Sequence, residues 1–180
     1  MRIIAGRSKG RTIVGPKGSG TRPMTDRVRE ALFSSLGSTV MDARVIDLYA
    51  GSGSLGLESL SRGAQTAVFV EQSREALLAL RRNVTWVGLG GEVHRGDVNR
   101  FLDRCAVSFN LAFIDPPYAL SLASVEEVLA KLERLLDADA TVVVHRRVGE
   151  EAPEVPDRLN LVGERTYGDS RLWTYQKEET

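Results

Sequence analysis

Apolar residues recur along this chain of 180 residues in two patterns, short continuous runs and stripes of helical spacing, which alternate from residue 44 onward. Five runs rich in β-branched and aromatic residues predict buried strands at 44–49, 66–71, 92–95, 111–114 and 141–145. Helical stripes between them predict helices at about 54–62, 73–87 and 122–136. Strands that alternate with helices indicate a mostly parallel sheet covered on both faces, so we expect an α/β fold.

The chain before residue 25 departs from this alternation. Two β-like runs at 2–6 and 11–14 flank a turn-like stretch, which predicts a small β-hairpin. The glycine- and proline-rich stretch at 15–20 predicts a loop. Thr25 is suited to cap a helix, and apolar residues at helical spacing extend that helix to about Leu36.

Residues 25–180 read as one domain that closes with a second hairpin, predicted from the runs at 159–165 and 171–176. The hydrophobic share of 42% and the charged share of 27% are typical of a soluble globular protein. No run is long enough to span a membrane, the N-terminal residues lack the apolar core of a signal peptide, and Cys105 is the only cysteine. We therefore expect a cytoplasmic protein, with a monomer as the default.

Charge divides the chain into two parts although the formal net charge is zero. Residues 1–30 hold eight basic and two acidic residues, a net charge of +6, and the remainder holds 16 basic and 22 acidic residues, a net charge of −6. A basic segment on an acidic body is typical of a nucleic-acid-binding arm, so we expect residues 1–24 to form a hairpin and loop that contact a nucleic acid. The alternative is a solvated charged face. The residues expected to contact the nucleic acid, which the family resemblance given below implies is RNA, are Arg2, Arg7, Lys9, Arg11, Arg22, Arg27 and Arg29.

A glycine turn follows the first predicted strand. Residues 51–56 form a G-x-G-x-x-G between a strand and a helix, and Glu71 ends the next strand 20 residues after Gly51. This spacing also fits a nicotinamide-dinucleotide site, so the motif alone is ambiguous. Asp47, at the end of the first strand, would repel a pyrophosphate but can pair with the ammonium of an amino acid. The acid therefore favours S-adenosylmethionine, with its carboxylate at the amides of the turn.

The other expected cofactor contacts surround a nucleoside. The two oxygens of Glu71 can accept both ribose hydroxyls, whereas Asp97 can accept from the amine of adenine while Val98 packs on the ring. A solvated strand end for Glu71 and a helix N-cap for Asp97 are the alternatives. The residues expected to bind the cofactor are Asp47, Gly51, Ser52, Gly53, Glu71, Asp97 and Val98.

A second motif, Asp115-Pro116-Pro117-Tyr118, follows the fourth predicted strand. Proline cannot donate to a sheet, so the strand ends at the acid, and the two prolines hold the acid, a carbonyl and an aromatic ring in one stiff arrangement. Asp115 and the carbonyl of Pro116 can accept the two N–H groups of an exocyclic amine, and Tyr118 can stack on its base. We expect these three residues to be catalytic; a proline-ended strand that leads into a loop is the alternative.

The two motifs together resemble those of class I S-adenosylmethionine-dependent methyltransferases that act on exocyclic amines of nucleobases. The stretches at 2–6, 9–11 and 22–30 narrow the resemblance to the RsmD family, which methylates guanine N2 in bacterial small-subunit (16S) ribosomal RNA. Met24 and Tyr118 depart from the residues common in that family, but neither change removes a group that the chemistry needs. The resemblance implies a Rossmann-like seven-stranded sheet whose last strand is antiparallel, a basic N-terminal hairpin on RNA, and S-adenosylmethionine as cofactor.

Other functions remain open from the sequence. Acid-Pro-Pro-aromatic motifs also serve methylation of adenine N6 in DNA, although the chain has no room for a separate target-recognition domain. A non-catalytic RNA-binding or ribosome-assembly module with a nucleoside pocket is a further alternative, and a nicotinamide-dependent dehydrogenase is the weakest. His94 and His145 lack the cysteine spacing of a metal site and are interpreted as ordinary strand-end residues, so no metal is expected.

Overall fold

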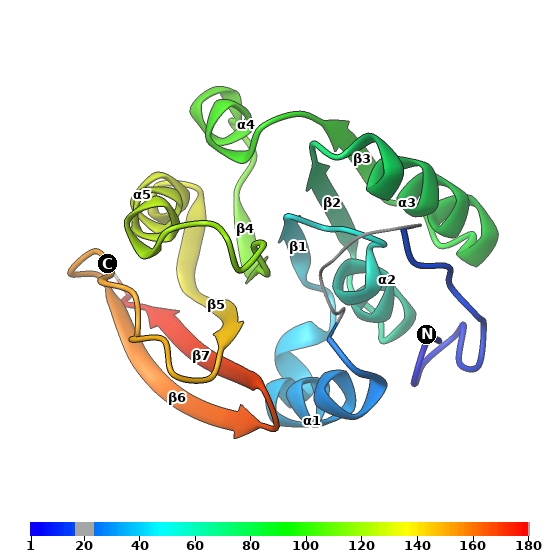
Figure 1. Ribbon diagram of the computed structural model, residues 1–180, viewed down its shortest axis with the longest axis horizontal. Helices are drawn as coiled ribbons and strands as arrows, with labels where there is room; N and C mark the ends of the chain where they lie inside the picture. Colours follow the sequence, from blue (N-terminus) through cyan, green and yellow to red (C-terminus); the bar gives the residue numbers. More distant parts are fainter. Residues whose placement is uncertain (17–23, 180) are drawn as a thin grey trace.

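The computed structural model describes residues 1–16 and 24–179. Figure 1 shows a twisted sheet with helices on both of its faces. The strands are β1 (Arg44–Leu48), β2 (Thr66–Glu71), β3 (Glu92–Arg95), β4 (Phe109–Ile114), β5 (Leu136–Arg147), β6 (Leu159–Tyr167) and β7 (Ser170–Lys177). The helices are α1 (Asp26–Leu36), α2 (Ser54–Ser61), α3 (Arg74–Val87), α4 (Val98–Arg104) and α5 (Leu122–Glu133), with a short 3-10 helix η1 (Gly37–Val40) after α1.

The sheet has the strand order β3-β2-β1-β4-β5-β7-β6. Strands β1 to β5 pair in parallel, and β7 runs antiparallel to both of its neighbours. The expected Rossmann-like, seven-stranded fold is therefore confirmed. The chain runs outward from β1 to β3 and then returns to the other side of β1, so the strand order reverses between β1 and β4. Ligands of open α/β sheets bind where the strands end at such a reversal, which places the expected site at the ends of β1 and β4.

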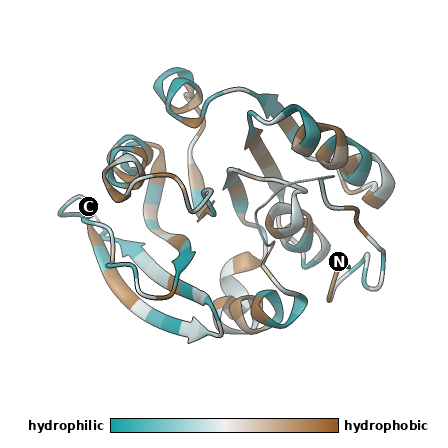
Figure 2. Ribbon diagram, in the orientation of Figure 1, coloured by the Kyte–Doolittle hydropathy of each residue, from teal (hydrophilic) through white to brown (hydrophobic). Residues whose placement is uncertain are grey.

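Each face of the sheet carries its own hydrophobic core. Helices α1, α2 and α3 cover one face, with Leu32, Leu57 and Leu80 fully or almost fully buried. Helices α4 and α5 cover the other face, with Leu102 and Leu129 buried. Figure 2 shows hydrophobic stretches on the central strands and mixed hydrophobic and hydrophilic turns on the surrounding helices. A sheet buried on both faces explains why its strands appear in the sequence as continuous apolar runs.

Side-chain caps fix where most of the helices begin. Thr25, Ser73, Asp97 and Ser121 each precede a helix, and the side-chain oxygen of each accepts a hydrogen bond from a backbone N–H three residues later. Such a cap typically contributes about 1 kcal/mol, because the first N–H groups of a helix have no partner inside it. The caps also set where each loop at the ligand-binding edge stops.

The N-terminal segment, residues 1–16, forms less of a hairpin than the sequence predicts. Its one β-bridge joins Arg2 and Thr12. Beyond that bridge, the N–H groups of Ile4 and Ala5 donate to the carboxylate of Glu58 on α2, at 2.7 and 3.1 Å, instead of pairing across the turn. The predicted two-stranded hairpin is therefore shortened because a buried acid of the main domain competes for its backbone.

The same segment belongs to the main hydrophobic core. Ile3 and Ile13 are buried among the residues of α1, α2 and α3. Asn83 on α3 accepts from the N–H of Val14 at 2.9 Å and donates to its carbonyl at 2.8 Å. Gly6 has a φ of +82°, and a Cβ there would lie 1.8 Å from the carbonyl oxygen of residue 61. The N-terminal segment is thus packed against α2 and α3 along its length.

Candidate active site

Two carboxylates at the ends of β1 and β2 hold the glycine loop, residues 49–56, which runs from β1 into the first turns of α2. Asp47 accepts from the N–H of Gly56 at 2.9 Å, and Glu71 accepts from the N–H of Gly51 at 2.8 Å. Gly51 and Gly53 have φ values of 57° and 79°, a region that favours glycine. The loop is therefore fixed by two acids that the sequence assigns to the cofactor.

The electrostatics of Asp47 point to a cationic ligand. Its side chain is 1% exposed, and burial raises the pKa of its carboxyl well above the ordinary value of 3.8. The N–H of Gly56 lowers this pKa, whereas the carboxylates of Asp115 and Glu71 raise it further. Positive charge favours the ionised form of a buried acid that has two other acids nearby. The three acids therefore fit the ammonium and sulfonium groups of S-adenosylmethionine.

Glu71 has fewer free hydrogen-bond acceptor sites than the sequence suggests. Besides holding Gly51, it accepts from the N–H groups of Gln72 and Ser73 at 2.9 and 2.7 Å. An ionised carboxylate has about four acceptor sites, so about one remains for a ribose hydroxyl unless a backbone contact is exchanged. Glu71 is thus firmly oriented, and its contact with the ribose stays a prediction.

The remaining cofactor candidates lie along the same edge. Asp97 is exposed and accepts from the N–H of Arg100 at 3.0 Å, so it fills the helix-capping role that the sequence left open. Val98, the first residue of α4, is buried. Ser52 is also buried, and Asn83 donates to its carbonyl at 2.9 Å. The structure brings these residues together at the carboxyl ends of β1, β2 and β3, and their contacts with adenine stay predictions.

The acid-proline motif begins where β4 ends. The side chain of Asp115 is 30% exposed, Pro116 is buried, and Tyr118 is half-buried. Burial raises the pKa of the Tyr118 phenol, and the neighbouring Asp115 raises it further. The phenol therefore stays neutral at physiological pH.

Two buried residues of β5 hold this motif, and the sequence reasoning missed both roles. The Nδ1 atom of His145 lies 2.7 Å from Oδ1 of Asp115. Arg146 donates to the carbonyls of residues 117, 118 and 120 at 3.2, 3.5 and 2.8 Å, and it pairs with Glu150 at 2.6 Å. The loop that follows β4 is therefore fastened from the neighbouring strand.

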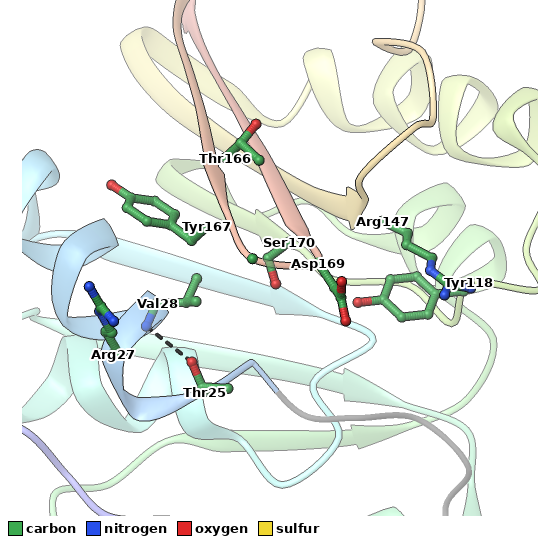
Figure 3. Close-up of a pocket in the computed structure, with 10 residues that line it drawn as sticks. Thr25, Arg27, Val28, Tyr118, Arg147, Thr166, Tyr167, Asp169 and Ser170 are labelled. Carbon is green, nitrogen blue, oxygen red and sulfur yellow. Dashed lines mark hydrogen bonds between the residues drawn. The ribbon is translucent and has the colours of Figure 1, made fainter.

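A cavity of about 780 Å³ opens beside the motif, between the start of α1 and the turn that joins β6 to β7. We call it the α1 cavity. Figure 3 shows Tyr118, Arg147 and Asp169 near one another at one end and Thr25, Arg27 and Val28 at the other. Residues that line it include Thr25, Arg27, Tyr118, Arg147, Tyr167 and Asp169. Two cations, an acid and two aromatic rings suit a nucleotide.

The structure separates the seven basic residues expected to contact RNA. Arg27 is exposed and lines the α1 cavity. Arg2 and Lys9 are exposed on the N-terminal segment, and Arg2 lies 3.9 Å from the carboxylate of Asp26. Arg22 lies outside the described residues. Of the described candidates, Arg27 is the one that lines the cavity.

Arg7, Arg11 and Arg29 have partners within the protein. Arg11 donates to the carbonyls of residues 86 and 87 at 2.8 and 2.9 Å, and Arg7 donates to the carbonyl of Leu60 at 3.4 Å. These contacts satisfy carbonyls at the ends of α3 and α2. Arg29 is fully buried, and burial lowers the pKa of its guanidinium. Arg29 points into the protein, so we do not retain it as an RNA contact.

The strand order, the glycine loop and the acid-proline motif define a class I methyltransferase. TrmN from Thermus thermophilus shares the fold, with a TM-score of 0.71 and 20% identity over 86% of this chain and 49% of that chain. Putative methyltransferase yhhF from Escherichia coli superposes with a TM-score of 0.89 at 36% identity, over 100% of this chain and 99% of that chain. The described residues thus share the fold of this enzyme class.

Comparison of sequences identifies the family. A family model described as Conserved hypothetical protein 95 matches residues 1–176. Ribosomal RNA small subunit methyltransferase D of Escherichia coli strain K12 is 36% identical, over 99% of this chain and 90% of that protein. Putative rRNA methyltransferase YlbH of Bacillus subtilis is 34% identical, over 98% of this chain and 99% of that protein. The chain therefore belongs to the RsmD family, which confirms the resemblance seen in its motifs.

Proposed function

We propose that this protein transfers the methyl group of S-adenosylmethionine to the exocyclic N2 amine of one guanine in bacterial 16S ribosomal RNA. The observation that carries the proposal is the position of Asp115. Its N–H donates at 3.4 Å to the carbonyl of Leu48, the residue after Asp47, and Tyr118, three residues further along the chain, lines the α1 cavity. Asp115 therefore stands between the cofactor residues and a cavity suited to a nucleotide.

The cofactor is held by residues at the carboxyl ends of β1, β2 and β3. Asp47 pairs with the ammonium of the methionyl part, and the amides at residues 51–53 receive its carboxylate. Glu71 accepts from the ribose, and Asp97 with Val98 holds the adenine. When bound, S-adenosylmethionine supplies a methyl group attached to a positively charged sulfur.

The acceptor is an amine whose lone pair is delocalised into the ring of the base, so the site must orient it. Asp115 and the carbonyl of Pro116 accept its two N–H groups, which turns the nitrogen lone pair toward the methyl group. As the nitrogen becomes cationic, the carboxylate of Asp115 stabilises it and accepts one proton. Catalysis in this scheme depends mainly on positioning.

The target base occupies the α1 cavity as an unpaired nucleotide, stacked on Tyr118, because an amine inside a stacked duplex cannot reach Asp115. Arg27 and Arg147 lie at opposite sides of this cavity and suit the phosphates that flank the base (Figure 3). The partner is accordingly ribosomal RNA or the assembling small subunit in the cytoplasm. In the described residues, no helix is long and apolar enough to cross a membrane.

A transfer assay with tritiated S-adenosylmethionine tests the proposal. The substrates are small-subunit particles that lack the modification, naked 16S ribosomal RNA and duplex DNA. We expect label only in the ribosomal substrates, released as N2-methylguanosine after digestion to nucleosides. Label in DNA alone would instead indicate an adenine N6 enzyme. Donor binding without transfer to any substrate would indicate a non-catalytic assembly module.

A further inference from the structure

His145 and Asp115 meet because of the register between two parallel strands. Ile114 on β4 lies beside Val144 on β5, so the next residue of each strand is the other's neighbour. Side chains alternate between the faces of a sheet, and the residues two positions earlier, at 113 and 143, lie in the core on the α1 side. The backbone thus directs both Asp115 and His145 toward the α1 side.

The contact between these side chains is short and shielded from water. Nδ1 of His145 lies 2.7 Å from Oδ1 of Asp115, and the histidine side chain is 3% exposed. The roles of the two atoms depend on the imidazole tautomer, and the tautomer with its hydrogen on Nδ1 donates to a carboxylate, which accepts.

The second imidazole nitrogen indicates that packing alone does not explain why a histidine, rather than an apolar residue, occupies position 145. Nε2 of His145 is buried without a hydrogen-bond partner among residues 1–16 and 24–179. A buried polar atom without a partner has lost its hydrogen bonds to water without replacement, a cost that an apolar side chain of similar size would avoid. The hydrogen bond to Asp115 is thus the feature of His145 that an apolar residue could not provide.

We propose that His145 is the positioning residue of the methyl transfer: its Nδ1–H holds Oδ1 of Asp115 so that Oδ2 faces the target amine. This inference rests on the proposed function. In the step itself, a bond forms between the amine nitrogen and the methyl carbon while the carbon–sulfur bond breaks, and sulfur keeps the electron pair. One amine proton passes to Oδ2 of Asp115. His145 keeps its proton and holds the carboxyl group in place throughout.

Two variants separate positioning from packing in the tritium assay. His145→Phe keeps the ring but removes the donor, and we expect kcat to fall about 10–100-fold, because small misplacements of reacting groups are costly. The KM for the ribosomal substrate and the Kd of S-adenosylmethionine stay within about twofold, since the side chain of His145 is 3% exposed and offers almost no surface to either ligand. His145→Asn places an amide N–H where Nδ1 stands and recovers most of kcat. The control is Asn160→Ala, at an exposed residue of β6 that pairs with Glu178, which leaves kcat unchanged.

Nitrogen NMR of the imidazoles gives an answer that depends neither on turnover nor on the folding of a variant at position 145. In the wild-type protein at neutral pH, we expect Nδ1 of His145 to be protonated, with a signal that moves in Asp115→Ala; His94→Gln assigns the two histidines. An unprotonated Nδ1 would overturn the inference. So would equal kcat in the wild type and His145→Phe, or equal losses in His145→Phe and His145→Asn. If the wild type methylates nothing, the proposed function fails, while the NMR result still decides the pairing of His145 with Asp115.

Discussion

The two halves of the site are made rigid in different ways. In the cofactor half, β1–β3 with the glycine loop, acids bind backbone amides close in the chain: Asp47 holds an amide 9 residues away, and Glu71 holds one 20 residues away. In the acceptor half, the loop at 115–120 is held by His145 and Arg146 from the next strand, 26 to 30 residues away. In the first half, acids at the ends of β1 and β2 hold backbone N–H groups, whereas in the second half basic side chains of β5 hold the carboxylate and the carbonyls of the loop.

Because the two halves are held separately, substitutions in them should affect different steps, donor binding in one half and methyl transfer in the other. Changes in the cofactor half should weaken donor binding, whereas changes in the acceptor half should stop transfer and leave donor binding intact.

The largest effect is expected at Asp115, where Asp115→Ala removes the acceptor of the amine proton. We expect transfer to fall by about 10²–10⁴-fold, the usual contribution of a general base, with the Kd of S-adenosylmethionine nearly unchanged by calorimetry. Asp103→Ala, at an exposed acid that pairs with Lys131, is the control. Near-normal transfer by Asp115→Ala would refute the mechanism.

Glu71→Ala tests the converse prediction, that a change in the cofactor half weakens donor binding and affects kcat much less. The variant loses a charged acceptor for the ribose and the anchor of Gly51. Hydrogen bonds to charged groups contribute about 1.5–3 kcal/mol, so the Kd of S-adenosylmethionine should rise about 10–150-fold, with kcat at saturating donor much less affected. Glu164→Ala, on the distant β6 strand, should change neither quantity. A normal Kd in Glu71→Ala would show that Glu71 only supports the loop.

Tyr118 tests whether the α1 cavity receives the target base. Stacking of a base on an aromatic ring is worth about 1–3 kcal/mol, so Tyr118→Ala should raise the KM for the RNA substrate by about 5–150-fold. Tyr118→Phe keeps the ring and should stay close to wild type. Donor binding, measured by calorimetry, should be normal in both variants. Equal KM values in the wild type and Tyr118→Ala would place the base elsewhere.

The smallest effect is expected among the arginines, where the structure distinguishes Arg27, which lines the α1 cavity, from side chains that donate to carbonyls of the protein itself. Arg27→Ala should weaken RNA binding a few-fold and reduce the slope of log K against log salt by about 1, as loss of one phosphate contact predicts. Arg7 donates to a carbonyl at the end of α2, so Arg7→Ala should leave the salt dependence of RNA binding unchanged. Equal slopes for the two variants would contradict the assignment of Arg27 to the cavity.

The same contrast explains what the sequence could and could not predict. Local patterns in the sequence predict the strands, the fold and the glycine loop. Apolar runs with an acid at or near their end, namely Asp47, Glu71 or Asp115, indicate both the strands and the candidate site residues. His145 ends an equally ordinary run, and its role depends on the register of β5 against β4, which no local pattern encodes. The basic N-terminal residues carry the same formal charge in the sequence. Only packing shows that Arg29 is buried and that Arg11 binds the end of α3.

The most direct measurement is a map of modified bases in 16S ribosomal RNA from cells with this protein, without it, and with Asp115→Ala in its place. We predict that one guanine carries an N2-methyl group only in the first cells, and that this guanine is unmodified in the other two. An unchanged set of modified bases in all three cell lines would contradict the account.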